Sequence, residues 1–295
     1  MPRDIESLPM SEILTYEEII TVAETAAALG ITRIKITGGE PLVRRDCCNL
    51  IRSLKNVEGI EQVTLTTNGV LLSEFADELA DIGIDGINIS IDTLNAAKYS
   101  DITGSDCLDA VLSGLDAAVA AGLRVKINAV SLDRDVYDLI ELARKSQVDV
   151  RFIEMMPIGY GRDYESVSHT ELIPEIRARY ESMTEDETVR GNGPARYYRI
   201  DGFAGHIGFI SAVHRAFCDS CNRIRLTPQG FLKSCLCYDT GVDLRSIIRD
   251  DTSKEAVREN LKRALTEAIL CKPKAHSFSD EEMISEKHVM SEIGG

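Results

Sequence analysis

The chain has 295 residues, of which 44% are hydrophobic and 27% charged, and its formal net charge is −15. This composition is that of an ordinary soluble protein with room for one large and one smaller domain. The negative charge disfavours nucleic acid as a partner. No apolar run approaches the roughly 18 residues that cross a bilayer, and residues 1–12 resemble neither a signal nor a transit peptide. We therefore expect a cytoplasmic protein with no membrane and no nucleic-acid partner.

The first half of the chain alternates short β-branched runs with helix-period segments. The runs predicted as strands are Arg33–Thr37, Gln62–Thr67, Gly86–Ile91, Arg124–Val130 and Asp149–Glu154. Helices are predicted at Tyr16–Leu29, Leu71–Ile82, Cys107–Ala121 and Tyr137–Lys145, where apolar residues recur at steps of three and four. This alternation predicts an α/β fold of successive parallel units that roll into a TIM-like barrel.

The pattern changes near Gly159, so the sequence predicts two domains, a barrel domain over 1–158 and a smaller α+β domain over 159–295. Antiparallel strands are predicted at Ala195–Ile200, His206–Ile210, Arg223–Leu226 and Phe231–Cys235, and helices at Thr170–Arg179 and Asp250–Leu270. Glu185–Pro194 is predicted to be a polar loop. The second domain would hold the cysteine site described next.

Eight cysteines in a chain without an export signal are more typical of reduced thiols or metal ligands than of disulfides. Cys218 and Cys221 are separated by two residues, and Cys235 follows after thirteen intervening residues, a spacing suited to a metal or a cluster. Three interpretations stay open. Three thiolates would leave one iron of a 4Fe-4S cluster open to another ligand; Cys237 could complete a structural zinc site; or all four could be inert buried thiols.

Several polar residues lie where a phosphorylated ligand could reach them. Arg223 and Arg225 alternate along one strand beside the cysteines and could clamp a phosphate. Lys35 and Lys126 both lie within predicted strands. A lysine is unfavourable there unless its side chain faces a pocket or solvent. Polar residues also recur where successive strands end, and barrel enzymes build their sites at these ends. The sequence predicts one shared pocket there.

Longer motifs resemble a known family. They are ITGGEPLVRRD (Ile36–Asp46), TLTTNGVLL (Thr64–Leu72), NISIDTLN (Asn88–Asn95), RVKINAV (Arg124–Val130), RFIEMMPIG (Arg151–Gly159), GPARYY (Gly193–Tyr198), GHIGFIS (Gly205–Ser211), FCDSCNRIRLTPQG (Phe217–Gly230) and the terminal MSEIGG. Over nearly its whole length the chain resembles the radical S-adenosylmethionine GTP 3',8-cyclases of molybdenum cofactor biosynthesis. In that family one 4Fe-4S cluster cleaves S-adenosylmethionine, and the resulting radical converts GTP to 3',8-cyclo-7,8-dihydro-GTP.

The resemblance assigns roles to individual residues. It implies a second 4Fe-4S cluster, facing guanine, that is held by Cys218, Cys221 and Cys235. GTP would be bound by Lys35, Thr66, Lys126, Arg223 and Arg225, and S-adenosylmethionine would be contacted by Gly39, Glu40, Ser90 and Met156, with Glu40 at its amino group. The resemblance also implies a catalytic role for Gly294 and Gly295. It further implies a homodimer and a downstream cyclic pyranopterin monophosphate synthase.

One family motif is missing. Family members hold the S-adenosylmethionine cluster on a Cys-x3-Cys-x2-Cys loop after the first barrel strand, followed by Met-Pro, whereas this chain begins at Met1-Pro2. Cys47, Cys48 and Cys107 do not supply that spacing. The resemblance therefore implies a truncated barrel of five units lacking its first strand, with Arg33–Thr37 at an unprotected edge, and a chain that is inactive as written. The alternatives are a non-catalytic GTP- and cluster-binding remnant, or a structural zinc module.

Overall fold

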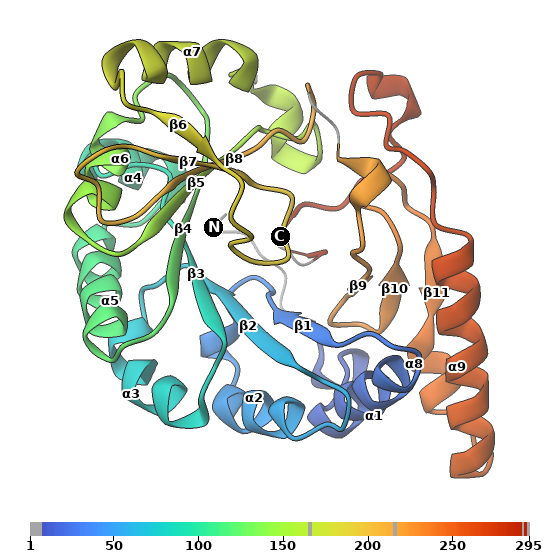
Figure 1. The fold of residues 1–295 in the computed structure, drawn as a ribbon. Helices are drawn as coiled ribbons and strands as arrows, with labels where there is room; N and C mark the ends of the chain where they lie inside the picture. The colour runs from blue at the N-terminus through green and yellow to red at the C-terminus, as the bar shows by residue number, and fades with distance from the viewer. Residues whose placement is uncertain (1–7, 165–166, 215–216, 291, 294–295) are drawn as a thin grey trace.

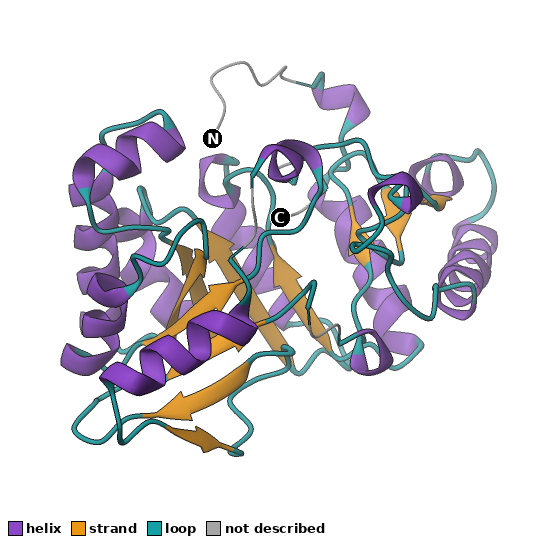
Figure 2. Ribbon diagram, turned by 90° about the horizontal axis from the view of Figure 1, so that it is seen from above, coloured by secondary structure: helices purple, strands orange, loops and turns teal. Residues whose placement is uncertain are grey.

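The computed structural model describes residues 8–164, 167–214, 217–290 and 292–293. A curved sheet forms the centre of the larger part, and helices α1 to α6 lie along its outer face (Figure 1). A small second sheet stands beside it with helices α8 and α9 (Figure 2). None of the helices in the described ranges combines the length and apolar character of a membrane span.

The large sheet has eight strands in the order β1-β2-β3-β4-β5-β8-β7-β6. Their bounds are β1 Arg33–Ile36, β2 Gln62–Thr67, β3 Gly86–Ser90, β4 Val125–Val130, β5 Asp149–Ile153, β6 Thr184–Asp186, β7 Arg196–Arg199 and β8 Ile207–Ile210. Neighbours from β1 to β5 are parallel, β8 adds in parallel to β5, and β7 and β6 follow antiparallel. All five predicted barrel strands are confirmed to within two residues at each end.

The helices of this part are α1 Tyr16–Ala28, α2 Cys47–Lys55, α3 Leu72–Ile82, α4 Ala96–Thr103, α5 Leu108–Ala120, α6 Tyr137–Lys145 and α7 His169–Arg179. Apolar residues on their inner faces, such as Leu79 and Val111, are buried with the outward-facing residues of the strands. Thr15 begins α1 with a capping box, because its side chain accepts from the Glu18 amide and the Glu18 side chain accepts from the Thr15 amide. Helices α2 and α4 were not among the predicted helices.

The inner face of the barrel is polar. Along β4 the residues Val125, Ile127 and Ala129 are buried against the helices, while Lys126 and Asn128 alternate to the other face. In register with Lys126 lie polar residues of three neighbouring strands, namely Thr66, Asn88 and Asp149. Closed barrels usually fill this space with branched apolar side chains. A polar interior instead provides room and hydrogen bonds for a ligand, and we call this space the lumen.

The remaining elements form a second layer beside α1. A three-stranded antiparallel sheet contains β9 (Arg225–Leu226), β10 (Phe231–Lys233) and β11 (Gly241–Asp243). Helices α8 (Leu244–Ile248) and α9 (Lys254–Leu270) follow, and Leu261 and Leu265 of α9 share an apolar cluster with Val22 of α1. Short 3-10 helices are η1 (Met10–Glu12), η2 (Pro41–Val43), η3 (Gly159–Asp163), η4 (Cys218–Ser220) and η5 (Glu281–Met283).

Two expectations need correction. The parallel part of the described sheet has six strands rather than five, because β8 pairs with β5. The large sheet continues past the predicted boundary at 158/159, since β6, β7 and β8 all follow it. The polar loop predicted from Glu185 begins later, because Glu185 and Asp186 belong to β6. In the described part β1 pairs only with β2, so it forms one end of the sheet as expected.

Candidate functional site

Lys35 on β1 lies close enough to four other cationic side chains of the lumen and its border for their charges to act on it: Lys126 on β4, Arg151 on β5, Arg223 before β9 and Arg225 on β9. Partial burial, together with the charges of the other four, lowers the pKa of Lys35 to about 7. Burial beside Arg223 lowers the pKa of Arg225 to about 10. In a chain of net charge −15 such a concentration of positive charge defines a local anion site.

Arg151 is the most deeply buried of these cations, with 7% of its surface exposed. Its Nη2 donates to Asn88 Oδ1 at 2.5 Å, and Asn88 Nδ2 donates in turn to Thr66 Oγ1 at 3.1 Å. Its Nε has no hydrogen-bond partner within the described residues. A buried guanidinium N–H without an acceptor costs free energy, so this group is ready to take an anion. Arg151 was not among the binding residues predicted from the sequence.

Lys126 is held by the segment that joins β6 to β7. Its Nζ donates to the carbonyl oxygen of Arg190 and, at 3.0 Å, to Tyr197 Oη. Burial, with Arg151 nearby, lowers the pKa of Lys126 to about 8. Asn192 of the same segment donates to Gln62 Oε1 at 2.6 Å, at the first residue of β2. Residues 187–195 therefore close the amino-terminal end of the barrel.

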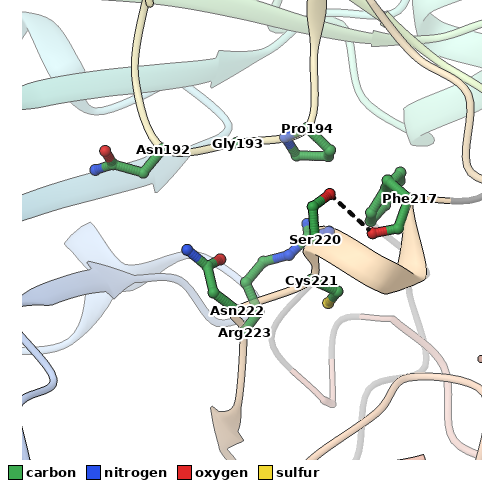
Figure 3. Close-up of a pocket in the computed structure, with 8 residues that line it drawn as sticks. All are labelled: Asn192, Gly193, Pro194, Phe217, Ser220, Cys221, Asn222 and Arg223. Atoms are coloured by element: carbon green, nitrogen blue, oxygen red, sulfur yellow. Dashed lines mark hydrogen bonds between the residues drawn. The ribbon is translucent and has the colours of Figure 1, made fainter. Parts of the chain in front are cut away.

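A pocket of about 120 Å³ links this segment to the cysteines. Figure 3 shows the residues that line it, which are Asn192, Gly193, Pro194, Phe217, Ser220, Cys221, Asn222 and Arg223. The Arg223 guanidinium packs over the Phe217 ring, 4.7 Å from its centroid. The cationic lumen and the cysteine segment thus adjoin each other.

Cys218, Cys221 and Cys235 are free and partly exposed. Burial raises the pKa of Cys221, but the Arg223 amide and the charge of Arg223 outweigh it, so the net shift is downward. The His276 amide donates to Cys218 Sγ at 3.4 Å. The lowered pKa of Cys221 favours its thiolate, the form in which cysteine binds metals.

Cys237 differs from these three cysteines. It is fully buried, its sulfur accepts from the Ser277 amide at 3.3 Å, and burial raises its pKa. Zinc bound at 2.3 Å by a tetrahedron of thiolates would hold their sulfurs about 3.8 Å apart. In the described residues no three of these sulfurs lie within 4.8 Å of one another. The positions of these sulfurs therefore give the zinc interpretation no support, and an iron–sulfur cluster, which is larger, spreads its ligands further.

The residues predicted for S-adenosylmethionine lie where parallel strands end. Gly39 and Glu40 follow β1, Ser90 is the exposed last residue of β3, and Met156 follows β5. Glu40 is 8% exposed and accepts from Leu42 N, Thr67 Oγ1 and Asn68 N at 3.0, 2.8 and 2.6 Å. A carboxylate offers about four acceptor sites, so one remains for an amine. Gly294 and Gly295 lie outside the described residues.

Glu154, at the end of β5, is one of the polar residues that lie where the predicted strands end, but no individual role was predicted for it. It is fully buried and accepts from the amides of Val213 and His214 at 2.9 and 3.0 Å and from that of His169 at 3.0 Å. It thereby fixes the segment that precedes the cysteines. An acidic residue directly after an apolar strand was the available signal.

The barrel and the adjoining cysteine segment define the class of protein. Residues 3–145 match the Radical SAM superfamily, and residues 148–278 match Molybdenum Cofactor Synthesis C. Among solved structures, Streptococcus suis SuiB bound to precursor peptide SuiA has a TM-score of 0.57 at 14% identity, covering 99% of this chain and 71% of that one. At this identity the likeness concerns the fold alone.

Curated relatives are closer in sequence. The GTP 3',8-cyclase of Clostridium perfringens (strain SM101 / Type A) is 41% identical over 288 residues, which are 96% of this chain and 88% of that protein. The enzyme of the same name from Ectopseudomonas mendocina is 38% identical and covers 100% of this chain and 90% of its own. The chain belongs to the GTP 3',8-cyclase family.

Proposed function

We propose that the lumen binds GTP and that the chain forms the body of a GTP 3',8-cyclase of molybdenum cofactor biosynthesis, which uses S-adenosylmethionine to form 3',8-cyclo-7,8-dihydro-GTP. The observation that carries the proposal is the group of five lumen cations beside three accessible cysteines. A triphosphate of roughly −4 charge matches this group. Lys35, Lys126, Arg223 and Arg225 would bind the phosphates, with Arg151 as a further donor and Thr66 as a neutral contact.

The cysteines support a cluster at the base end of the substrate. Cys218, Cys221 and Cys235 would hold a 4Fe-4S cluster, whose fourth iron supplies an open coordination position for guanine. Their partial exposure and the lowered pKa of Cys221 beside Arg223 support this ligand set. Cys237 stays outside it because it is fully buried and burial raises its pKa.

A direct experiment measures GTP binding and metal content together. After anaerobic reconstitution with iron and sulfide, we expect about four irons per chain and saturable GTP binding. The Cys221→Ala variant should lose the iron, whereas the Cys237→Ala variant should keep it. One stoichiometric zinc without acid-labile sulfide would contradict the cluster. Absence of GTP binding would contradict the proposed substrate.

The S-adenosylmethionine half of the reaction needs a second ligand set. The 295 residues contain no Cys-x3-Cys-x2-Cys motif, so we expect this chain by itself to bind GTP without cleaving S-adenosylmethionine. Supplying that motif on an N-terminal extension should produce 5'-deoxyadenosine in the presence of dithionite. A GTP-binding remnant would instead stay inactive with the extension. The proposal also includes two partners. One is a second copy of the chain in a homodimer, which is supported by the position of β1 at the end of the large sheet in the described residues. The other is a downstream cyclic pyranopterin monophosphate synthase.

A further inference from the structure

A buried ion pair joins the cysteine region to the C-terminal tail, defined here as the described residues 286–290 and 292–293. Lys233 Nζ donates to Glu286 Oε2, and these side chains are 1% and 0% exposed. Lys233 ends β10 two residues before Cys235, and it is in register with Arg225 of β9. A charge this deeply buried is tolerated only when it is paired, so each partner depends on the other.

Glu286 also organises the tail itself. Its Oε1 accepts from the amides of Lys287 and His288 at 3.0 and 2.8 Å and from His288 Nδ1 at 2.8 Å. Its own amide donates to the Cys237 carbonyl at 3.3 Å, and its carbonyl accepts from Arg162 Nη2 at 2.8 Å. One residue thus connects the tail, the segment after Cys235 and η3.

Beyond Glu286 the tail packs closely against the site. A Cβ on Gly159 would lie 2.9 Å from Val289 Cα, so the tail backbone fits against η3 where only glycine leaves room. Ile293 is 2% exposed and shares an apolar cluster with Ile158 and Met156 after β5 and with Cys235. The tail therefore runs between the segment proposed for S-adenosylmethionine and the segment proposed for the cluster.

The same acidic group could be mistaken for a metal site. Ligand atoms of Asp239, Glu286 and His288 lie within 4.8 Å of one another. However, Lys233 Nζ bonds to Glu286 and lies 3.5 Å from Asp239 Oδ1. The ammonium group already supplies the positive charge that a metal ion would bring.

We propose that Lys233 and Glu286 are positioning residues that fix the C-terminal tail against the site. The proposal rests on the proposed function, because that function gives the neighbouring Met156 and Cys235 segments their roles. Lys233 and Glu286 would act through the tail and not through contact with GTP. Losing the pair should free the tail while the cationic lumen keeps its geometry.

Hydrogen–deuterium exchange of the full chain tests this directly. In Glu286→Gln we expect the amides of residues 286–293 to exchange roughly tenfold faster or more, while β2 to β4 keep their protection. GTP affinity should stay within about twofold of the unmodified chain, because Glu286 lies outside the lumen. Glu282→Gln, the same substitution at an exposed tail-side position, is the control and should change neither quantity.

A second pair of variants isolates the ionic coupling. Lys233→Met leaves an unpaired buried carboxylate, so it should loosen the tail more than the double variant Lys233→Met/Glu286→Gln, which removes both charges. Three results would overturn the proposal. The tail amides could exchange at an unchanged rate in Glu286→Gln, or the amides of β2 to β4 could exchange faster by the same factor as those of the tail. The tail amides could also exchange faster in the double variant than in Lys233→Met. Failure of the unmodified chain to bind GTP would instead overturn the proposed function, which the tail exchange does not measure.

Discussion

At the scale of single residues, the most consequential side chains are charged groups that the fold places in the lumen. From the sequence alone, an arginine within a strand is expected at the surface. Only the arrangement of β3, β5 and β7 shows that Arg151 is buried and that its Nε has no hydrogen-bond partner in the described residues. Lys35 and Lys126 were predictable because lysine is unusual in such strands. Glu286 was not predictable, since one glutamate in an acidic tail looks solvated.

Arg151 makes a specific prediction. Replacing it with Gln should weaken GTP binding roughly tenfold to a hundredfold, because a hydrogen bond to a charged group contributes about 1.5–3 kcal/mol. Calorimetric titration measures the change. Arg263→Gln, at an exposed position of α9, serves as the control. Equal affinities of the Arg151 and Arg263 variants would contradict a role for Arg151 in anion binding.

Lys35 predicts a pH dependence. Its pKa is lowered to about 7 in the free chain, and a bound anion favours the charged form. GTP affinity should therefore fall as pH rises above 7, with proton uptake on binding. Lys35→Arg stays charged and should remove the decline that begins near pH 7, leaving the part due to Lys126, whose pKa is about 8. An unchanged profile in Lys35→Arg would contradict this account.

At the scale of elements, alternation and periodicity predicted which segments are strands but not how all of them pair. His206–Ile210 was correctly predicted as a strand, yet nothing local indicates that it joins β5 in parallel, because pairing depends on the crossover through α7, β6 and β7. Helix α2 has nine residues, as the correctly predicted α6 does, but it begins after Asp46, which has a φ of 60° and makes no side-chain cap. A left-handed residue at the start of a helix is uncommon, so the start of α2 was not recognised although its apolar residues lie on one face.

The contact between α3 and α5 supplies a prediction at this scale. A Cβ on Gly114 of α5 would lie 2.5 Å from the Gly69 carbonyl oxygen and 3.0 Å from Leu72 Cβ. Gly114→Ala should therefore lower the free energy of unfolding by about 1–3 kcal/mol, despite alanine's better helix propensity. Urea denaturation measures the loss. Ser113→Ala, at an exposed neighbouring position, is the control, and a stabilised Gly114 variant would show that the helices can shift apart.

At the scale of the whole molecule, an acidic protein encloses a cationic lumen. Because the two charges are opposite, salt should affect GTP binding in two ways. Salt screens the negative charge of the protein surface, which should raise the association rate of GTP. It also screens the cations of the lumen, which should weaken the equilibrium affinity for GTP. Burial is the main cause of the lowered Lys35 pKa, and repulsion by the neighbouring cations adds to it. This repulsion destabilises the folded state. A triphosphate would relieve it, so bound GTP should raise the melting temperature, and GTP in the cell would then stabilise the fold of the chain that binds it.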